Sequence, residues 1–134
     1  MKAQVAVEYM IIVGVGLIMI FLSVNYLLGL FQSYSDENKI SLAKNSVYKI
    51  GENADLVFSQ GPPAKVRVEI YIPESVQEIS FSNKTVLFKV KTSSGVNDIF
   101  YNSIPQIIGI LPIKSGQYYI SLTSDQNYVN ISVV

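Results

Sequence analysis

Residues 9–31 read YMIIVGVGLIMIFLSVNYLLGLF and contain no charged side chain. About 20 apolar residues in a helix cross a hydrocarbon core about 30 Å thick, and this stretch exceeds that length. A chain of 134 residues is too small to cover such a helix on every side with its own core. The stretch is therefore predicted to insert into a membrane at some stage.

The charges around the apolar stretch predict its orientation. Lys2 precedes it, whereas Asp36 and Glu37 are the first charged residues after it. Because positively charged flanks stay in the cytoplasm, we expect the N-terminus to be cytoplasmic and residues 36 onward to lie outside.

The overall composition argues against most catalytic chemistry. Apolar residues make up 49% of the chain and charged residues 15%, and the formal net charge is zero. Histidine, cysteine and tryptophan are absent, so the commonest general base, thiol catalysis and thiolate metal sites are missing. The ten carboxylates are dispersed and the lysines are not clustered with the tyrosines. We expect no catalytic residue, no metal, no cofactor and no nucleic-acid partner.

A small residue lies before the apolar stretch rather than after it. A conventional secretory signal is cut beyond its apolar core, but here Ala3 precedes the core, so a cut beside it leaves the apolar segment on the mature chain. Residues 2–9, KAQVAVEY, resemble the class III signal peptide of archaeal type IV pilins. The resemblance implies cleavage between Ala3 and Gln4, a leader of residues 1–3, and Glu8 as the family's glutamate.

The motif of the resemblance consists of Lys2, Gln4, Glu8 and Tyr9, with Ala6 where the family often has serine and Ile12 where it often has leucine. Residues 71–74, 91–95 and 116–120 also look like the β-domains of these pilins. An ordinary signal anchor is the alternative if Ala3 is not a cleavage site.

Glu8 lies at the entrance of the apolar stretch, where a carboxylate is costly to carry into hydrocarbon, by about 3 kcal/mol. Cleavage after Ala3 gives Gln4 a free amino group one helical turn away. The carboxylate of one subunit would then pair with the amine of a neighbour and set their axial register. Alternatively, Glu8 lies at the headgroup level near the helix start, where a negative charge is favoured.

The resemblance implies a structural subunit of a surface filament. Its expected partners are further copies in a helical filament, a prepilin peptidase, an assembly ATPase and a membrane platform protein. The precursor would lie in the cytoplasmic membrane, and the mature chain in an extracellular filament that supports adhesion or cell–cell contact. The side chains expected to build the filament core are Ile12, Val13, Leu17, Ile20, Phe21, Val24, Leu28 and Phe31.

Other functions stay open at this point. The chain is alternatively a minor pilin, a single-span anchored adhesin or binding module, or an archaellum-type filament subunit. An anchored enzyme is a further class, which the missing histidine and cysteine disfavour.

Beyond the apolar stretch, one apolar stripe at spacings of three and four residues predicts that the helix continues to about Phe58. We favour one long helix, which residues 35–38 can bend or recap, and Gly61-Pro62-Pro63 would end it. The stripe is interpreted as core facing a sheet rather than as a coiled coil. It consists of Ile40, Ala43, Val47, Ile50, Ala54 and Val57.

After Lys65 the apolar period changes to two, which is typical of strands. Residues 97–101 are ambiguous, and residues 104–113, with Pro105, Gly109 and Pro112, are interpreted as an edge strand or loop. The remaining strands are predicted at residues 65–72, 76–81, 86–91, 118–122 and 129–133. We therefore predict an α+β fold in which a long helix, residues 4–60, packs on an antiparallel sheet or small sandwich of five or six strands, residues 64–134.

Two N-x-S/T sequons fall in the half expected to lie outside the cell, at Asn83 and Asn130. Asn83 is expected in a turn, and Asn130 on the outward face of a strand if Val129 and Ile131 point inward. Both are candidate glycosylation sites.

Overall fold

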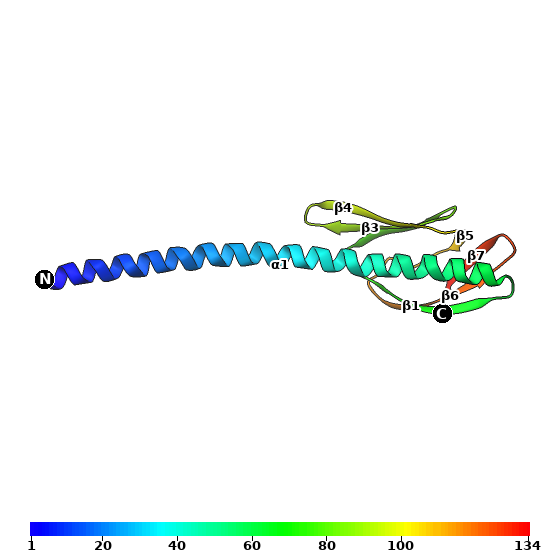
Figure 1. The fold of residues 1–134 in the computed structure, drawn as a ribbon, viewed down its shortest axis with the longest axis horizontal. Coiled ribbons are helices and arrows are strands. Elements are labelled where there is room, and N and C mark those ends of the chain that lie inside the picture. Colours follow the sequence, from blue (N-terminus) through cyan, green and yellow to red (C-terminus); the bar gives the residue numbers. More distant parts are fainter. The chain divides into compact units, whose positions relative to one another are not determined.

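The computed structural model describes residues 1–134 and contains one helix and seven strands (Figure 1). The helix α1 spans Lys2–Gln60 without interruption. Residues 35–38, where the sequence allows a bend or a new cap, are helical, in line with the favoured prediction of one long helix. The strands are β1 (Lys65–Ile72), β2 (Val76–Ser82), β3 (Thr85–Thr92), β4 (Gly95–Asn102), β5 (Gln106–Gly109), β6 (Gly116–Ser124) and β7 (Tyr128–Val133).

The chain divides into two compact units, Met1–Ser35 and Asp36–Val134. The first is helical throughout, and the second contains the remainder of α1 and all seven strands. Every buried apolar residue of the chain belongs to the second unit. We call this second unit the external unit, after the side of the membrane on which the flanking charges predict it to lie, and the first the apolar segment.

The strands form two sheets. One has the order β1-β6-β7-β5 and the other the order β2-β3-β4. All neighbouring strands are antiparallel except β5 and β7, which are parallel. The predicted α+β arrangement is confirmed: a long helix packs on a largely antiparallel β structure, which is consistent with a pilin-like fold.

The helix ends where its sequence predicts. Gly61 has a positive φ of 74° and its amide donates to the Phe58 carbonyl at 3.1 Å. Glycine takes this left-handed conformation without steric cost and closes helices in this way. Pro62 and Pro63 follow, and neither can supply the amide that would extend the helix.

The apolar stripe of α1 packs into the core as predicted. Ala43, Val47, Ile50 and Ala54 have no exposed surface, and Val57 has 1%. Ile40, the sixth member of the stripe, is partly buried against the same core. The core partners from the two sheets are Ile70, Ile72, Val76, Val86, Phe88, Val90, Ile107, Ile120, Leu122, Val129 and Ile131.

Polar side chains of α1 bind the free edge of β1. The Ser46 hydroxyl donates to the Tyr71 carbonyl at 2.5 Å and accepts from the Tyr71 amide at 3.2 Å. The Lys49 ammonium donates to the Glu69 carbonyl at 3.3 Å. An unpaired strand edge invites pairing with another chain, and these bonds occupy part of it.

The ambiguous segments both contain strands. Residues 97–101 lie in β4, whose side chains are mostly exposed, so they show little of the alternation that marks a half-buried strand. Within residues 104–113, only Gln106–Gly109 form a strand, and it is an edge strand. This accommodates Pro105 and Pro112, which lie outside β5.

Candidate functional site

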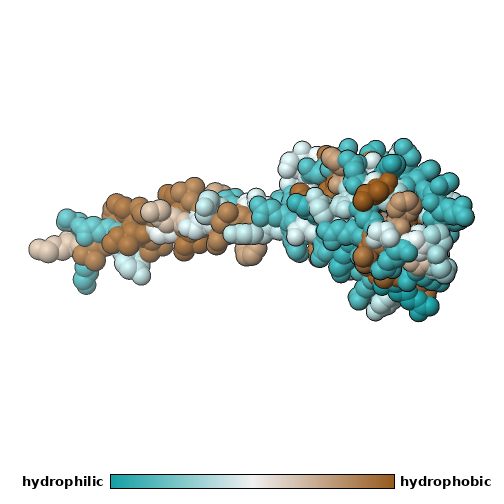
Figure 2. All heavy atoms as spheres, turned by 45° about the vertical axis from the view of Figure 1, so that its right-hand side comes forward, coloured by the Kyte–Doolittle hydropathy of each residue, from teal (hydrophilic) through white to brown (hydrophobic).

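The apolar segment of α1 leaves its large side chains exposed (Figure 2). The eight side chains expected to build a filament core are between 44% exposed, for Val13, and 70% exposed, for Phe31. By length and composition α1 qualifies as a membrane span, and none of its most apolar 18-residue window is buried. The core helix of a soluble protein can have the same length and composition, but most of it is buried. The apolar segment is not buried within this chain, so it is not the core helix of this chain's own fold.

This exposure is energetically unfavourable in water. Full burial of a Val, Leu, Ile or Phe side chain stabilises by about 1.5–3 kcal/mol. The segment carries many such side chains in succession, and soluble proteins rarely expose apolar patches of more than a few hundred Å². An apolar environment, either lipid or other protein surfaces, is therefore required to cover it.

The polar side chains of the segment bond to the helix itself. The Ser23 hydroxyl donates to the Met19 carbonyl at 2.8 Å. The Asn25 amide donates to the Phe21 carbonyl, also at 2.8 Å. Because hydrocarbon offers no hydrogen-bond partners, this internal pairing makes both residues compatible with an apolar environment.

The segment contains three glycines, and no contact within the chain requires a glycine at any of these positions. A Cβ added at Gly14, Gly16 or Gly29 would meet no atom within 4 Å. Glycine in a helix costs about 1 kcal/mol relative to alanine. In contacts between membrane helices, glycine allows two backbones to approach closely.

The residues of the N-terminal motif lie on consecutive turns of the helix. Lys2 is the first helical residue, so Ala3 and Gln4 are already helical. Glu8 and Tyr9 follow on the exposed surface. The Glu8 carboxylate makes no hydrogen bond or ion pair within the chain.

Both sequon asparagines are exposed. Asn83 occupies the β2–β3 turn with a positive φ of 54°, and Asn130 lies on β7 between the buried Val129 and Ile131. β7 is hydrogen-bonded on both sides, by β6 and β5. Asn83 therefore lies in a turn and Asn130 inside a paired strand, as the alternation of β7 predicts.

Two aspartates of α1 have roles that the sequence pattern did not indicate. Asp36 accepts hydrogen bonds from the Ser93 amide, at 3.0 Å, and from the Ser93 hydroxyl. Asp55 accepts from the Tyr101 hydroxyl at 2.8 Å and the Ile104 amide at 2.7 Å. Their partners lie far away in the sequence, so no local pattern indicates these bonds.

These bonds shift the pKa values of the groups involved. The hydrogen bonds from Ser93 are the main cause that lowers the pKa of Asp36 below its ordinary 3.8. The hydrogen bond to Asp55, followed by burial, raises the pKa of Tyr101 to about 12. Asp36 therefore binds the β3–β4 turn to α1 in its charged form, and Asp55 binds the other end of β4 to α1.

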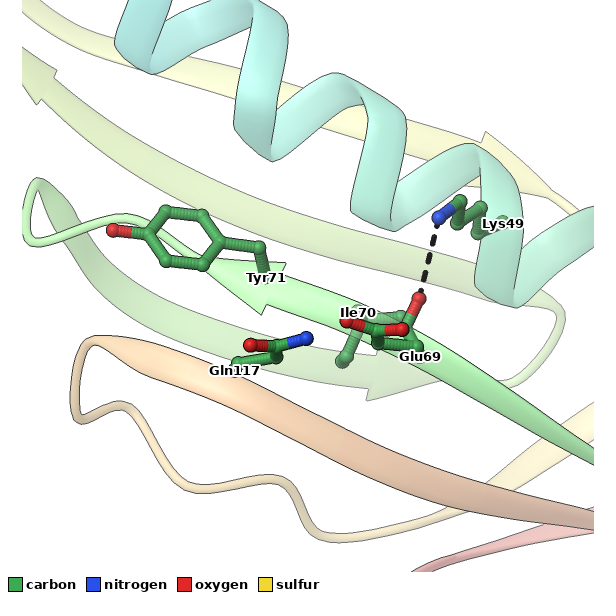
Figure 3. A pocket seen from close by; sticks show the side chains of 5 residues that line it. All are labelled: Lys49, Glu69, Ile70, Tyr71 and Gln117. Atoms are coloured by element: carbon green, nitrogen blue, oxygen red, sulfur yellow. Dashed lines mark hydrogen bonds between the residues drawn. The ribbon is translucent and has the colours of Figure 1, made fainter.

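A further feature not predicted from the sequence is a hollow of about 360 Å³ at the free edge of β1 (Figure 3). It is lined by Lys49, Glu69, Ile70, Tyr71 and Gln117. These residues come from α1, β1 and β6, so the site could not be predicted from a local sequence motif. No group of three or more acidic side chains gathers anywhere in the structure.

Comparison of the chain with protein-family models, with curated proteins and with solved structures found no significant match.

Proposed function

We propose that the chain is a structural subunit of an archaeal type IV pilus-like surface filament. The main support for the proposal is the difference in burial between the two parts of α1. Its apolar segment contains no buried residue, whereas its remaining part contributes a buried stripe to the complete core of the external unit. Folding of the chain itself therefore leaves the apolar segment unpartnered.

Identical segments of neighbouring copies supply the missing partner. In the precursor, lipid covers the segment. During assembly, the segment exchanges lipid for the same side chains of other copies, so that the burial of Ile, Leu, Val and Phe is preserved. The filament core is then a bundle of these helices, and the external units form its outer layer.

Processing and assembly follow from the N-terminal motif. A prepilin peptidase cleaves between Ala3 and Gln4, and an assembly ATPase with a membrane platform protein extracts the mature chain. Glu8 has no partner within the chain, and its carboxylate pairs with the new amino group of Gln4 on a neighbouring copy. Pairing of both charges removes the cost of carrying either one into an apolar bundle.

The second candidate is a single-span anchored binding module. The external unit, which has a core of its own and an open hollow on its surface, supports this function. Such a module uses the same membrane segment but does not polymerise.

The mass of the mature protein tests the processing step. We expect a chain that begins at Gln4. Ala3→Leu places a bulky residue at the cleavage position and should yield an uncut chain that stays in the membrane. Glu8→Gln should still be cut, because residue 8 lies a full turn beyond the cleaved bond, yet it should assemble few filaments. A mature chain that retains Met1 or Lys2 contradicts the proposal, and so does normal filament yield with Glu8→Gln.

A further inference from the structure

The hollow at the edge of β1 brings together polar side chains from three elements. Figure 3 shows the Tyr71 ring and the Glu69 carboxylate on β1, the Gln117 amide on β6, and Lys49 on α1. Glu69 and Tyr71 are two residues apart and lie on the same face of β1. Tyr71 is directly opposite Gln117 in the register of the two strands.

The backbone under these side chains is firmly held. Both the amide and the carbonyl of Tyr71 bond to the Ser46 hydroxyl, and the Glu69 carbonyl accepts from Lys49. On its other side β1 is paired along its whole length with β6. The hollow is therefore formed before any ligand arrives, which lowers the entropic cost of binding.

Several polar groups that line the hollow are free. The Glu69 carboxylate, the Tyr71 hydroxyl and the Gln117 amide make no side-chain hydrogen bond or ion pair within the chain. Tyr71 is 43% exposed although its backbone is fixed. These groups can bind a ligand without first breaking a bond inside the protein.

The lining selects a class of ligand by its charge. Lys49 and Glu69 carry opposite charges, so the hollow has no net charge that would favour phosphate or another ion. The lining is too polar for an apolar ligand. A carboxylate accepts several hydrogen bonds from hydroxyl groups, and a side-chain amide both donates to them and accepts from them. An exposed tyrosine ring offers a flat apolar surface.

From this combination we propose that the hollow binds a neutral saccharide. The sugar ring lies on the face of Tyr71, its hydroxyl groups donate to the Glu69 carboxylate, and the Gln117 amide donates and accepts. The volume of about 360 Å³ lies at the small end of small-molecule sites, about 300–1,000 Å³, and fits a short saccharide or the end of a longer one.

This inference rests on the proposed function for its biological meaning, because a filament would repeat the site along its length. A single site with a dissociation constant on the order of 1 mM corresponds to only about 4 kcal/mol. Repetition on one filament raises the overall strength of attachment by orders of magnitude without any new contact. The filament would thus adhere to neutral surface glycans.

The test uses the full chain in detergent and an array of neutral and acidic glycans, followed by NMR titration with the neutral glycan that is bound best. We expect binding to neutral glycans and a shift of the Gln117 side-chain amide. Tyr71→Ala should weaken binding by about tenfold or more, equal to about 1.4 kcal/mol. Gln117→Ala should weaken it as well.

Tyr119→Ala is the control, because Tyr119 is an exposed tyrosine of β6, 55% exposed against 43% for Tyr71, and does not line the hollow. Unchanged affinity in this variant supports the site. Binding to no neutral glycan, binding to acidic glycans alone, or equal losses in Tyr71→Ala and Tyr119→Ala would each overturn the inference. Because binding is measured on the solubilised chain, it is independent of polymerisation. Electron microscopy of Tyr71→Ala cells, which should still make filaments, reports separately on the proposed function.

Discussion

Gly51 lies where α1 and the ring of Tyr101 approach each other too closely for any side chain between them. Alanine is favoured over glycine in a helix by about 1 kcal/mol. At this position, however, the added methyl group would overlap the tyrosine ring, and such overpacking costs about 1–3 kcal/mol. We therefore expect Gly51→Ala to lower the free energy of unfolding of the external unit.

Denaturant unfolding of the detergent-solubilised chain, followed by tyrosine near-ultraviolet circular dichroism, measures this change. Gly29→Ala is the control, because a Cβ at Gly29 meets nothing within 4 Å. The external unit of this control should unfold at the same denaturant concentration as the unchanged protein. A Gly51→Ala protein as stable as the control contradicts the close contact with Tyr101.

Tyr101 is the side chain with the clearest dependence on pH. Its hydrogen bond to Asp55, with burial, raises its pKa from 10.0 to about 12. A raised pKa means that the folded state holds the proton longer than the unfolded state. The contribution to stability is therefore complete below pH 10 and is lost as the pH rises toward 12.

Tyrosinate absorbance during an alkaline titration follows this group. Tyr101 should ionise late in the folded chain, and so to some extent should Tyr128, whose pKa the hydrogen bond to Asp125 also raises. Asp55→Asn should bring only the pKa of Tyr101 closer to 10, because the charged acceptor is gone. Asp98→Asn, a change on the same strand β4, is the control and should leave the late titration in place. If Asp55→Asn leaves it in place too, the bond between Asp55 and Tyr101 is not the cause.

At the scale of elements, a single carboxylate of α1 binds the β3–β4 turn to the helix. Asp36 accepts both bonds from Ser93, and its pKa is lowered from 3.8 by them. Its stabilising effect is therefore present above that pH and is lost as the pH falls through the lower folded value. We expect Asp36→Ala to release the turn at neutral pH.

Hydrogen exchange of the amides of residues 92–96 measures this release, and it should become faster in Asp36→Ala. Glu37→Ala removes the neighbouring carboxylate, which makes no bond to the turn, and should leave the exchange unchanged. Equal exchange rates in the two variants would show that the turn is stable without its hydrogen bonds to Asp36.

The sequence predicts the elements well where a period is clear. The stripe from Ile40 to Val57 predicts the buried face of α1, and alternation predicts β1, β3, β6 and β7. It predicts less where the environment of a strand is unusual. β4 is exposed along most of its length, and the short β5 pairs in parallel with β7, so neither has a simple period.

Contacts between residues far apart in the sequence could not be predicted from the sequence. Asp36 meets Ser93 and Asp55 meets Ile104 only because β4 runs along α1. The hollow likewise needs Lys49, Glu69 and Gln117 from three elements. Pairing of strands into two sheets determines both features, and it depends on packing rather than on any local motif.

At the scale of the whole molecule, the external unit should fold without the apolar segment. All buried apolar residues lie between Ala43 and Ile131, so removal of residues 1–35 takes away no part of the core. We expect a chain of residues 36–134 to be soluble and monomeric and to unfold cooperatively. Size-exclusion chromatography and thermal unfolding provide the measurement. Aggregation or a molten state would show that the core depends on the apolar segment.

The central claim is that the apolar segment assembles with copies of itself. Cryo-electron microscopy of filaments sheared from cells that produce the chain tests it most directly. We expect a core of α-helices built from residues 4–35 of many copies, with the external units on the outside and no residue before Gln4. Filaments that lack this chain, or a chain that stays in the membrane as separate copies, would contradict it.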